Sequence, residues 1–203
     1  MAVWGCGPVG QFCIRSALLQ GAGHVVAIDR VQERLALAEK AGAEIINFDN
    51  EDVYDRLNHI TKGRGPDSCI DAVGMEAHGH GTWDAVADRA LAAVGVGTDR
   101  IHALRDCLRN VRAGCTVSLS GVYGGFLNMV PLGAAFQKGI TIRMGQCNVL
   151  NYIDDLMRMI EEGKIDPSFV ITHKVALEEA PKMYDVFKKK EDGCIKVVMK
   201  PNG

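Results

Sequence analysis

The stretch AVWGCGPVGQFCIRSALLQGAGHVVAID, residues 2–29, decides the fold of this chain. It starts with an apolar run at 2–4, passes through Gly5-Cys6-Gly7-Pro8-Val9-Gly10, and then shows the apolar spacing of a helix over 9–20. A second apolar run ends at Asp29, nineteen residues after Gly10. A G-x-G-x-x-G between a strand and a helix, with an acidic residue ending the next strand, is the spacing of a dinucleotide-binding turn.

Each glycine of this turn has a mechanical reason. The first makes the tight turn, the second lets the backbone approach a pyrophosphate, and the third lets the helix pack against the strand. The helix N-terminus then offers free N–H groups and a partial positive charge to phosphates. We therefore predict a cofactor-binding turn made of Gly5, Gly7, Pro8, Val9 and Gly10. The alternative is a tight glycine turn followed by an ordinary aspartate at a strand end.

Asp29 is predicted to accept hydrogen bonds from the ribose diol of an adenosine. Its carboxylate repels a 2′-phosphate, which favours NAD over NADP, although the neighbouring Arg30 could soften that repulsion. Arg34 lies one helical turn further on and could reach the same ribose or the adenine face, or remain a solvated helix charge. We expect Asp29→Ala to weaken NAD binding without unfolding the domain.

The rest of the chain alternates short apolar runs with amphipathic segments. Further strands are expected at 44–48, 68–73, 115–119 and 140–144, and further helices at 32–40, 51–61, 83–91, 99–111 and 132–138. Six apolar runs separated by helices predict the doubly wound α/β class, a six-stranded parallel sheet of the Rossmann type covered on both faces. A C-terminal αβαβ extension is expected from a helix at 152–162, a strand at 169–171, a helix at 178–190 and a strand at 194–199.

Composition excludes several classes of protein. The 203 residues suffice for one sizeable domain with an appendage, and a net charge of −2 gives no electrostatic case for binding nucleic acid or anionic lipid. No apolar run reaches membrane-spanning length, and the N-terminus lacks the features of a signal peptide. The seven cysteines include no C-x-x-C pair, so we expect reduced thiols and a cytoplasmic protein.

Ligands of open α/β sheets bind beyond the carboxyl ends of the strands, so the loops after the fourth, fifth and sixth strands are further candidates. Glycine-rich turns are also common after strands for structural reasons alone. His78 and His80 form an H-x-H in a glycine-rich loop, but no further ligand lies close by in sequence, and on a strand-end loop the pair could equally face a cofactor. We therefore predict no metal site, and we assign no catalytic residue.

Three separated motifs resemble the zinc-dependent medium-chain alcohol dehydrogenase family, in the branch of formaldehyde dehydrogenase and formaldehyde dismutase. They are Ala2 to Gly10, Cys69 to Gly79 and Gly121 to Gly125, and the resemblance extends from Met1 to about Pro201. It implies hydride transfer between NAD(H) and an alcohol or aldehyde, with a zinc ion polarising the oxygen. It also implies that residues of the strand-end loops line the nicotinamide side: Val73, Gly74, Val122, Tyr123, Arg143 and Gly145.

The resemblance also carries expectations about the whole assembly. Members of the family pair through their sixth strands, which here would be Ile140–Met144, and they hold zinc in a catalytic domain that precedes the coenzyme domain. We therefore expect residues 1–167 to form the NAD-binding domain and residues 168–203 to be a return segment of a missing zinc domain. Zinc is expected only in that domain, and the 203 residues by themselves are expected to bind NAD with little or no turnover.

Two alternatives remain open at this point. The chain could be an NAD-binding module without chemistry, or a subunit completed by another chain that carries the zinc domain. It could also be a methyltransferase that uses the same glycine turn and strand-end acid, although the full G-x-G-x-x-G and the six-strand alternation count against this reading.

Overall fold

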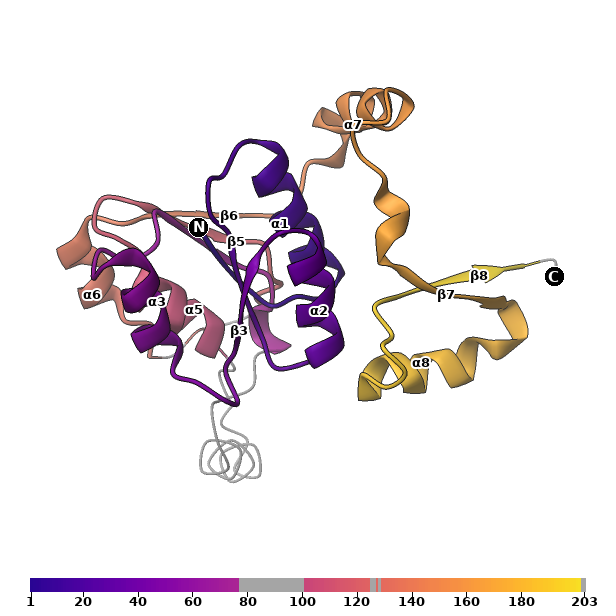
Figure 1. Ribbon diagram of the computed structural model, residues 1–203, viewed down its shortest axis with the longest axis horizontal. Helices are drawn as coiled ribbons and strands as arrows, with labels where there is room; N and C mark the ends of the chain where they lie inside the picture. Colours follow the sequence, from indigo (N-terminus) through magenta and orange to yellow (C-terminus); the bar gives the residue numbers. More distant parts are fainter. Residues whose placement is uncertain (77–100, 125–126, 128, 202–203) are drawn as a thin grey trace. The chain divides into compact units, whose positions relative to one another are not determined.

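The computed structural model describes residues 1–76, 101–124, 127 and 129–201. They belong to two compact units, Met1–Gly145 and Gln146–Gly203 (Figure 1). The helix expected at 83–91 and the pair His78 and His80 lie outside the described residues. The boundary expected at residue 167 divides the NAD-binding domain from a segment of the zinc domain in a complete enzyme. This boundary stays a prediction.

The first unit is built on a parallel sheet of six strands in the order β3-β2-β1-β4-β5-β6, which confirms the predicted fold class. Central strand β1 pairs with β2 on one side and β4 on the other, so that Val3 lies between Ala27 and Ile70. The chain order therefore reverses between β1 and β4, where such folds bind their ligands. The strands are β1 (Ala2–Trp4), β2 (Val26–Asp29), β3 (Glu44–Asn47), β4 (Ser68–Asp71), β5 (Thr116–Leu119) and β6 (Thr141–Met144).

Helices cover both faces of this sheet (Figure 1). Helices α1 (Pro8–Leu19) and α2 (Gln32–Lys40) cover one face, and α3 (Val53–Thr61), α5 (His102–Asn110) and α6 (Leu132–Lys138) cover the other. A 3-10 turn, Gly74–Glu76, follows β4.

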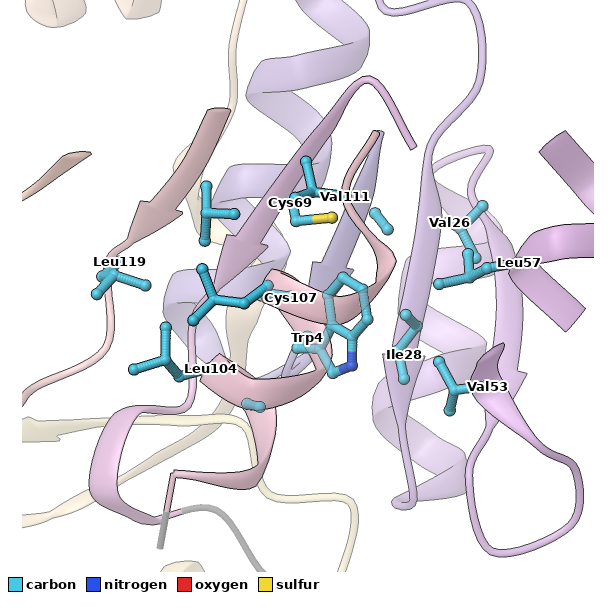
Figure 2. Close-up of a cluster of buried hydrophobic side chains, with 14 of the residues drawn as sticks. Trp4, Val26, Ile28, Val53, Leu57, Cys69, Leu104, Cys107, Val111 and Leu119 are labelled. Atoms are coloured by element: carbon cyan, nitrogen blue, oxygen red, sulfur yellow. The ribbon is translucent and has the colours of Figure 1, made fainter. Parts of the chain in front are cut away.

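Two hydrophobic cores result, because successive side chains of a strand point to opposite faces. Val3 packs with Ile14 and Leu35 under α1 and α2. Trp4 packs on the opposite face, in a cluster that includes Leu57 and Leu104 (Figure 2). Each fully buried aliphatic side chain stabilises the fold by roughly 1.5–3 kcal/mol, so both faces contribute to holding β1 in place.

The second unit contains the expected αβαβ elements. Strands β7 and β8 pair in parallel, and Val170, Met183, Cys194 and Ile195 are its buried apolar residues. The elements are a 3-10 turn (Val149–Asn151), α7 (Ile153–Glu161), a 3-10 turn (Pro167–Val170), β7 (Ile171–Ala176), a 3-10 turn (Leu177–Glu179), α8 (Ala180–Lys189) and β8 (Lys196–Lys200).

The strand expected at 169–171 is wrong in its position, because β7 begins only at Ile171. The preceding residues form a 3-10 turn that Asp166 caps, since its Oδ1 accepts the N–H of Ser168 at 2.8 Å. Pro167 at the first position of the turn fixes its backbone in a turn conformation. Across both units, no helix of the described residues is long and apolar enough to cross a membrane.

Candidate functional site

The loop from β1 to α1 has the geometry that its glycine spacing predicts. The N–H of Gly5 donates to the carbonyl of Ile28 at 2.8 Å, and a Cβ added to Gly10 would lie 1.7 Å from the carbonyl oxygen of Gly5. The first turn of α1 thus packs directly on the loop, as only glycine permits at position 10. Pro8 and Val9 open the helix, half-buried and exposed respectively.

Gly7 differs from the other two glycines of the loop. Its φ is −67°, which any residue adopts, and the nearest atom to an added Cβ is Nη1 of Arg34 at 3.7 Å, an ordinary contact. The protein's own packing therefore does not require glycine at this position. A ligand backbone that approaches the loop closely would require it, and this is the role that the second glycine has in a pyrophosphate-binding turn.

Asp29 lies at the end of β2 and is 7% exposed. Its Oδ2 accepts the N–H of Cys6 at 2.7 Å, and its Oδ1 accepts the N–H groups of Arg30 and Val31 at 2.7 and 3.0 Å. An ionised carboxyl group has room for about four hydrogen bonds, so acceptor capacity remains for a hydroxyl group. Asp29 thus fastens the glycine loop to β2 as well as being available to a ribose.

Arg34 and Gln11 lie beside the loop. The guanidinium of Arg34 approaches Gly7, and its buried Nε has no hydrogen-bond partner among the described residues. The fully buried Gln11 donates from Nε2 to the carbonyls of Cys6 and Arg34, at 3.0 and 2.8 Å. An anionic dinucleotide fits this arrangement: Arg34 provides a positive charge over the loop and an unused N–H donor, and there is open space at Gly7.

Arg30 lies at the rim of this site. Its Nε forms an ion pair of 3.4 Å with Asp49, in which both side chains are almost half exposed. Asp49 partly neutralises the charge of Arg30. Arg30 is therefore less able to offset the repulsion between the carboxylate of Asp29 and a 2′-phosphate. This arrangement favours a cofactor without that phosphate.

The candidate residues after β4 and β5 lie side by side. Val73 reaches the glycine loop, because a Cβ added to Gly5 would lie 2.6 Å from its Cγ2. Gly74 has a φ of +70° and touches the backbone of Val122, whose side chain is 83% exposed. Tyr123 turns its hydroxyl group back to Asp71 and donates a hydrogen bond to Oδ2.

Arg143 and Gly145 lie at the far end of the row of strands. Arg143 is exposed on β6, opposite Ser118 of β5, and Gly145 follows this strand with a φ of +150°. In the described part of the chain, no hydrogen bond joins either residue to the glycine loop. The structure therefore brings together twelve of the fourteen candidates around the ends of β1, β2, β4 and β5, and leaves these two beside them.

Burial keeps two titratable groups of the site protonated. Burial first, and then the charge of Asp29, raises the pKa of the Cys6 thiol well above its ordinary value. Burial, the charge of Asp71 and their hydrogen bond also raise the pKa of Tyr123. Neither group is therefore an anion at neutral pH, and Tyr123 keeps the proton that it donates to Asp71.

Three contributors to this site were not predicted from the sequence. Gln11 could have been suspected as a polar residue on the apolar face of α1, and Asp71 as a second acid at the end of a core strand. Asp49 carries no such signal, because only the folded structure shows that it pairs with Arg30.

One further cavity in the described part of the chain lies away from the glycine loop. A cavity of about 490 Å³ lies at the amino ends of β1, β2 and β4, where His24, Arg64 and Asp67 line it. Because open α/β sheets bind ligands at the carboxyl ends of their strands, we do not assign it to the cofactor. Among the described residues, no three His, Cys, Asp or Glu side chains come together as a metal site would need.

Comparison with known proteins agrees with this geometry. Residues 8–98 match the model of a family described as zinc-binding dehydrogenases. Over these residues the chain is similar to the zinc-binding dehydrogenase family. The match favours the dehydrogenase reading over that of a methyltransferase, and supports the resemblance to medium-chain alcohol dehydrogenases at the level of the family.

Relatives of the zinc-binding dehydrogenase family extend the likeness to almost the whole chain. An uncharacterized zinc-type alcohol dehydrogenase-like protein of Bacillus subtilis (strain 168), AdhB, is 42% identical over 206 residues, which cover 98% of this chain and 52% of the relative. The alcohol dehydrogenase of Thermus sp. ATN1 has a solved structure with 33% identity and a TM-score of 0.77, covering 98% of this chain and 52% of its own.

A structure with lower identity shares the fold. An alcohol dehydrogenase of Escherichia coli CFT073, solved with the cofactor NADH, is 21% identical with a TM-score of 0.74, over 98% of this chain and 51% of its own. The chain spans about half the length of the curated relatives that it matches.

Proposed function

We propose that this chain is the NAD-binding part of a zinc-dependent dehydrogenase that transfers hydride between NAD(H) and an alcohol or aldehyde. The observation that carries the proposal is the glycine loop. Asp29 accepts the N–H of Cys6 there, and Arg34 lies over Gly7, the glycine of this loop that the fold does not itself require. The NADH complex of a protein with the same fold supports the choice of cofactor.

Within this proposal, the loop and Arg34 bind the pyrophosphate and Asp29 binds the adenosine ribose. Val73, Gly74, Val122 and Tyr123 line the nicotinamide side, as do Arg143 and Gly145 at its edge. When bound in the complete enzyme, nicotinamide accepts or gives the hydride and zinc polarises the substrate oxygen. We expect zinc ligands outside these 203 residues, and little or no turnover from them alone.

The finer assignments belong to the same proposal. The motif from Asp71 to Ala77 supports the branch of formaldehyde dehydrogenase and formaldehyde dismutase, and the carboxylate of Asp29 supports NAD over NADP. Edge strand β6, whose Thr141, Arg143 and Met144 are exposed, supports a dimer through the sixth strands. A cytoplasmic location remains our expectation for a protein with reduced thiols.

A second candidate function is a subunit or module completed by another chain. Helix α7 supports it, since none of its side chains is fully buried within its own unit. Its apolar face is from 36% to 49% exposed and consists of Ile153, Leu156, Met157 and Ile160. Apolar faces of this kind commonly mark an interface with a partner.

The proposal is tested by replacing Gly7, because an added methyl group there is tolerated by the fold but fills the space for the pyrophosphate. We expect the wild-type chain to bind NAD in calorimetry and NADP at least about tenfold more weakly. Gly7→Ala should lower the NAD affinity at least about tenfold and leave the melting temperature within about 2 °C.

Gly23→Ala is the matched control. Gly23 has open space around it and lies in the loop before β2, at the opposite end of the sheet, so neither affinity nor stability should change. No saturable NAD binding by the wild-type chain, or full affinity in Gly7→Ala, would refute the proposal.

A further inference from the structure

Asp71 ends β4 and is fully buried, although it is an acidic residue. Its Oδ1 accepts the N–H groups of Val73 and Gly74, both at 2.9 Å, and the hydroxyl group of Tyr123 donates to its Oδ2. A buried carboxylate without such partners is costly, so the fold holds it there only because these donors converge on it. The side chain thus joins its own loop to the loop that follows β5.

The backbone of the same residue makes a second connection between these loops. The carbonyl of Asp71 accepts the N–H groups of Ser120 and Gly121, both at 2.9 Å, and Met75 donates to the carbonyl of Val122 at 3.1 Å. A Cβ added to Gly121 would lie 2.2 Å from the nitrogen of Gly74, so the two loops meet backbone against backbone. Their relative position is therefore set by contacts around Asp71.

This pair of loops also bears on the glycine loop. The N–H of Ala72 donates to the carbonyl of Trp4 at 2.9 Å, and Val73 fills the space beside Gly5. A shift of the loop after β4 would move Val73 relative to the turn that receives the pyrophosphate. The hydroxyl group of Tyr123 stays protonated at neutral pH, because burial and the neighbouring carboxylate raise its pKa.

We propose that Asp71 and Tyr123 form a latch that positions the nicotinamide-side loops before the cofactor binds. The carboxylate of Asp71 and the hydroxyl group of Tyr123 have a positioning role, because they face each other and act on the cofactor through Val73, Gly74 and Val122. The inference rests on the proposed NAD site. Without the latch, the loops would have to be ordered when the nicotinamide binds, and that ordering would reduce the affinity.

The test compares two ligands that differ in the nicotinamide. NAD engages the whole site, whereas ADP-ribose lacks the nicotinamide ring. In Tyr123→Phe, which removes only the hydroxyl group, we expect the NAD affinity measured by calorimetry to fall about tenfold and the ADP-ribose affinity to change less than about twofold. Tyr54→Phe is the matched control, since Tyr54 is 55% exposed on α3, and it should leave both affinities unchanged.

The outcomes separate the latch from the proposed function. If the wild-type chain binds neither ligand, the NAD site itself is refuted. The latch is refuted if the wild-type chain binds both ligands and the ratio of NAD affinity to ADP-ribose affinity in Tyr123→Phe stays within about twofold of the wild-type ratio. This includes the case in which Tyr123→Phe loses both affinities equally. Asp71→Asn serves as a second variant should Tyr123→Phe not fold. Its amide still accepts the two N–H groups, but it binds the tyrosine hydroxyl group without the charge, and such a bond is about half as strong. We expect the ratio of NAD affinity to ADP-ribose affinity to fall about threefold, and a folded Asp71→Asn with the wild-type ratio would refute the latch.

Discussion

Two buried aspartates, Asp29 and Asp71, each end a central strand and direct their carboxylate oxygens to backbone N–H groups of the loops. Asp29 holds Cys6 of the glycine loop, and Asp71 holds Val73 and Gly74 of the loop after β4. Hydrogen bonds to an ionised acceptor are about twice as strong as those between neutral groups. The two carboxylates therefore organise neighbouring loops at the switch point of the sheet.

The structure adds a cost in stability to the loss of NAD affinity that we expect from Asp29→Ala. Three N–H groups lose their acceptor, of which that of Cys6 is buried. We expect the free energy of unfolding in urea to fall by about 3 kcal/mol and the NAD affinity in calorimetry to fall with it.

Asp49→Ala is the control for this prediction, because it removes a nearby carboxylate. Among the described residues, Asp49 forms an ion pair only with Arg30, and both side chains are exposed to solvent. Its free energy of unfolding should change by less than about 1 kcal/mol. Equal stability of Asp29→Ala and wild type would show that the N–H groups of the loop find other partners.

The C-terminal end of helix α5 depends on a side chain from another helix. The ammonium group of Lys138, at the end of α6, donates to the carbonyls of Leu108, Arg109 and Val111, two of them at 3.4 and 3.1 Å. The last carbonyls of a helix have no partner within it and carry a partial negative charge. One cation thus caps α5 and connects it to α6.

Lys138→Met keeps the length and the apolar stem of the side chain but removes its charge and its donors. We expect the free energy of unfolding in urea to fall by about 1–2 kcal/mol, with NAD affinity unchanged. Lys40→Met is the control, because Lys40 also lies in the last turn of a helix but is exposed. A loss of the same size in both variants would argue against the cap.

On the scale of the whole molecule, the division into two units separates the binding site from the C-terminal elements. Every candidate cofactor residue, from Gly5 to Gly145, lies in the first unit, which has a core on each face of its sheet. A compact unit with its own core can fold alone.

We therefore expect a polypeptide of residues 1–145 to fold and to bind NAD with an affinity within about threefold of that of the 203-residue chain. Circular dichroism and calorimetry measure the two properties. A folded 1–145 polypeptide that has lost more than about tenfold in affinity would show that the second unit takes part in the site.

Local patterns in the sequence determined much of this protein. The apolar runs predicted six strands and their helices because side-chain periodicity is a property of neighbouring residues. The glycine spacing and Asp29 predicted the β1–α1 loop, since a strand, a tight turn and a helix lie within one short stretch. The strand predicted at 169–171 was misplaced, because the turn that Asp166 caps takes up the first two of its three residues.

Only the tertiary structure decided how distant segments meet. The order β3-β2-β1-β4-β5-β6 places β1 beside β4, and thereby Val73 beside Gly5. Asp71 and Tyr123 are 52 residues apart, and neither residue carries a local signal that names the other. Periodicity reports which side of an element is buried, whereas the partner across a contact depends on how the strands and helices pack together.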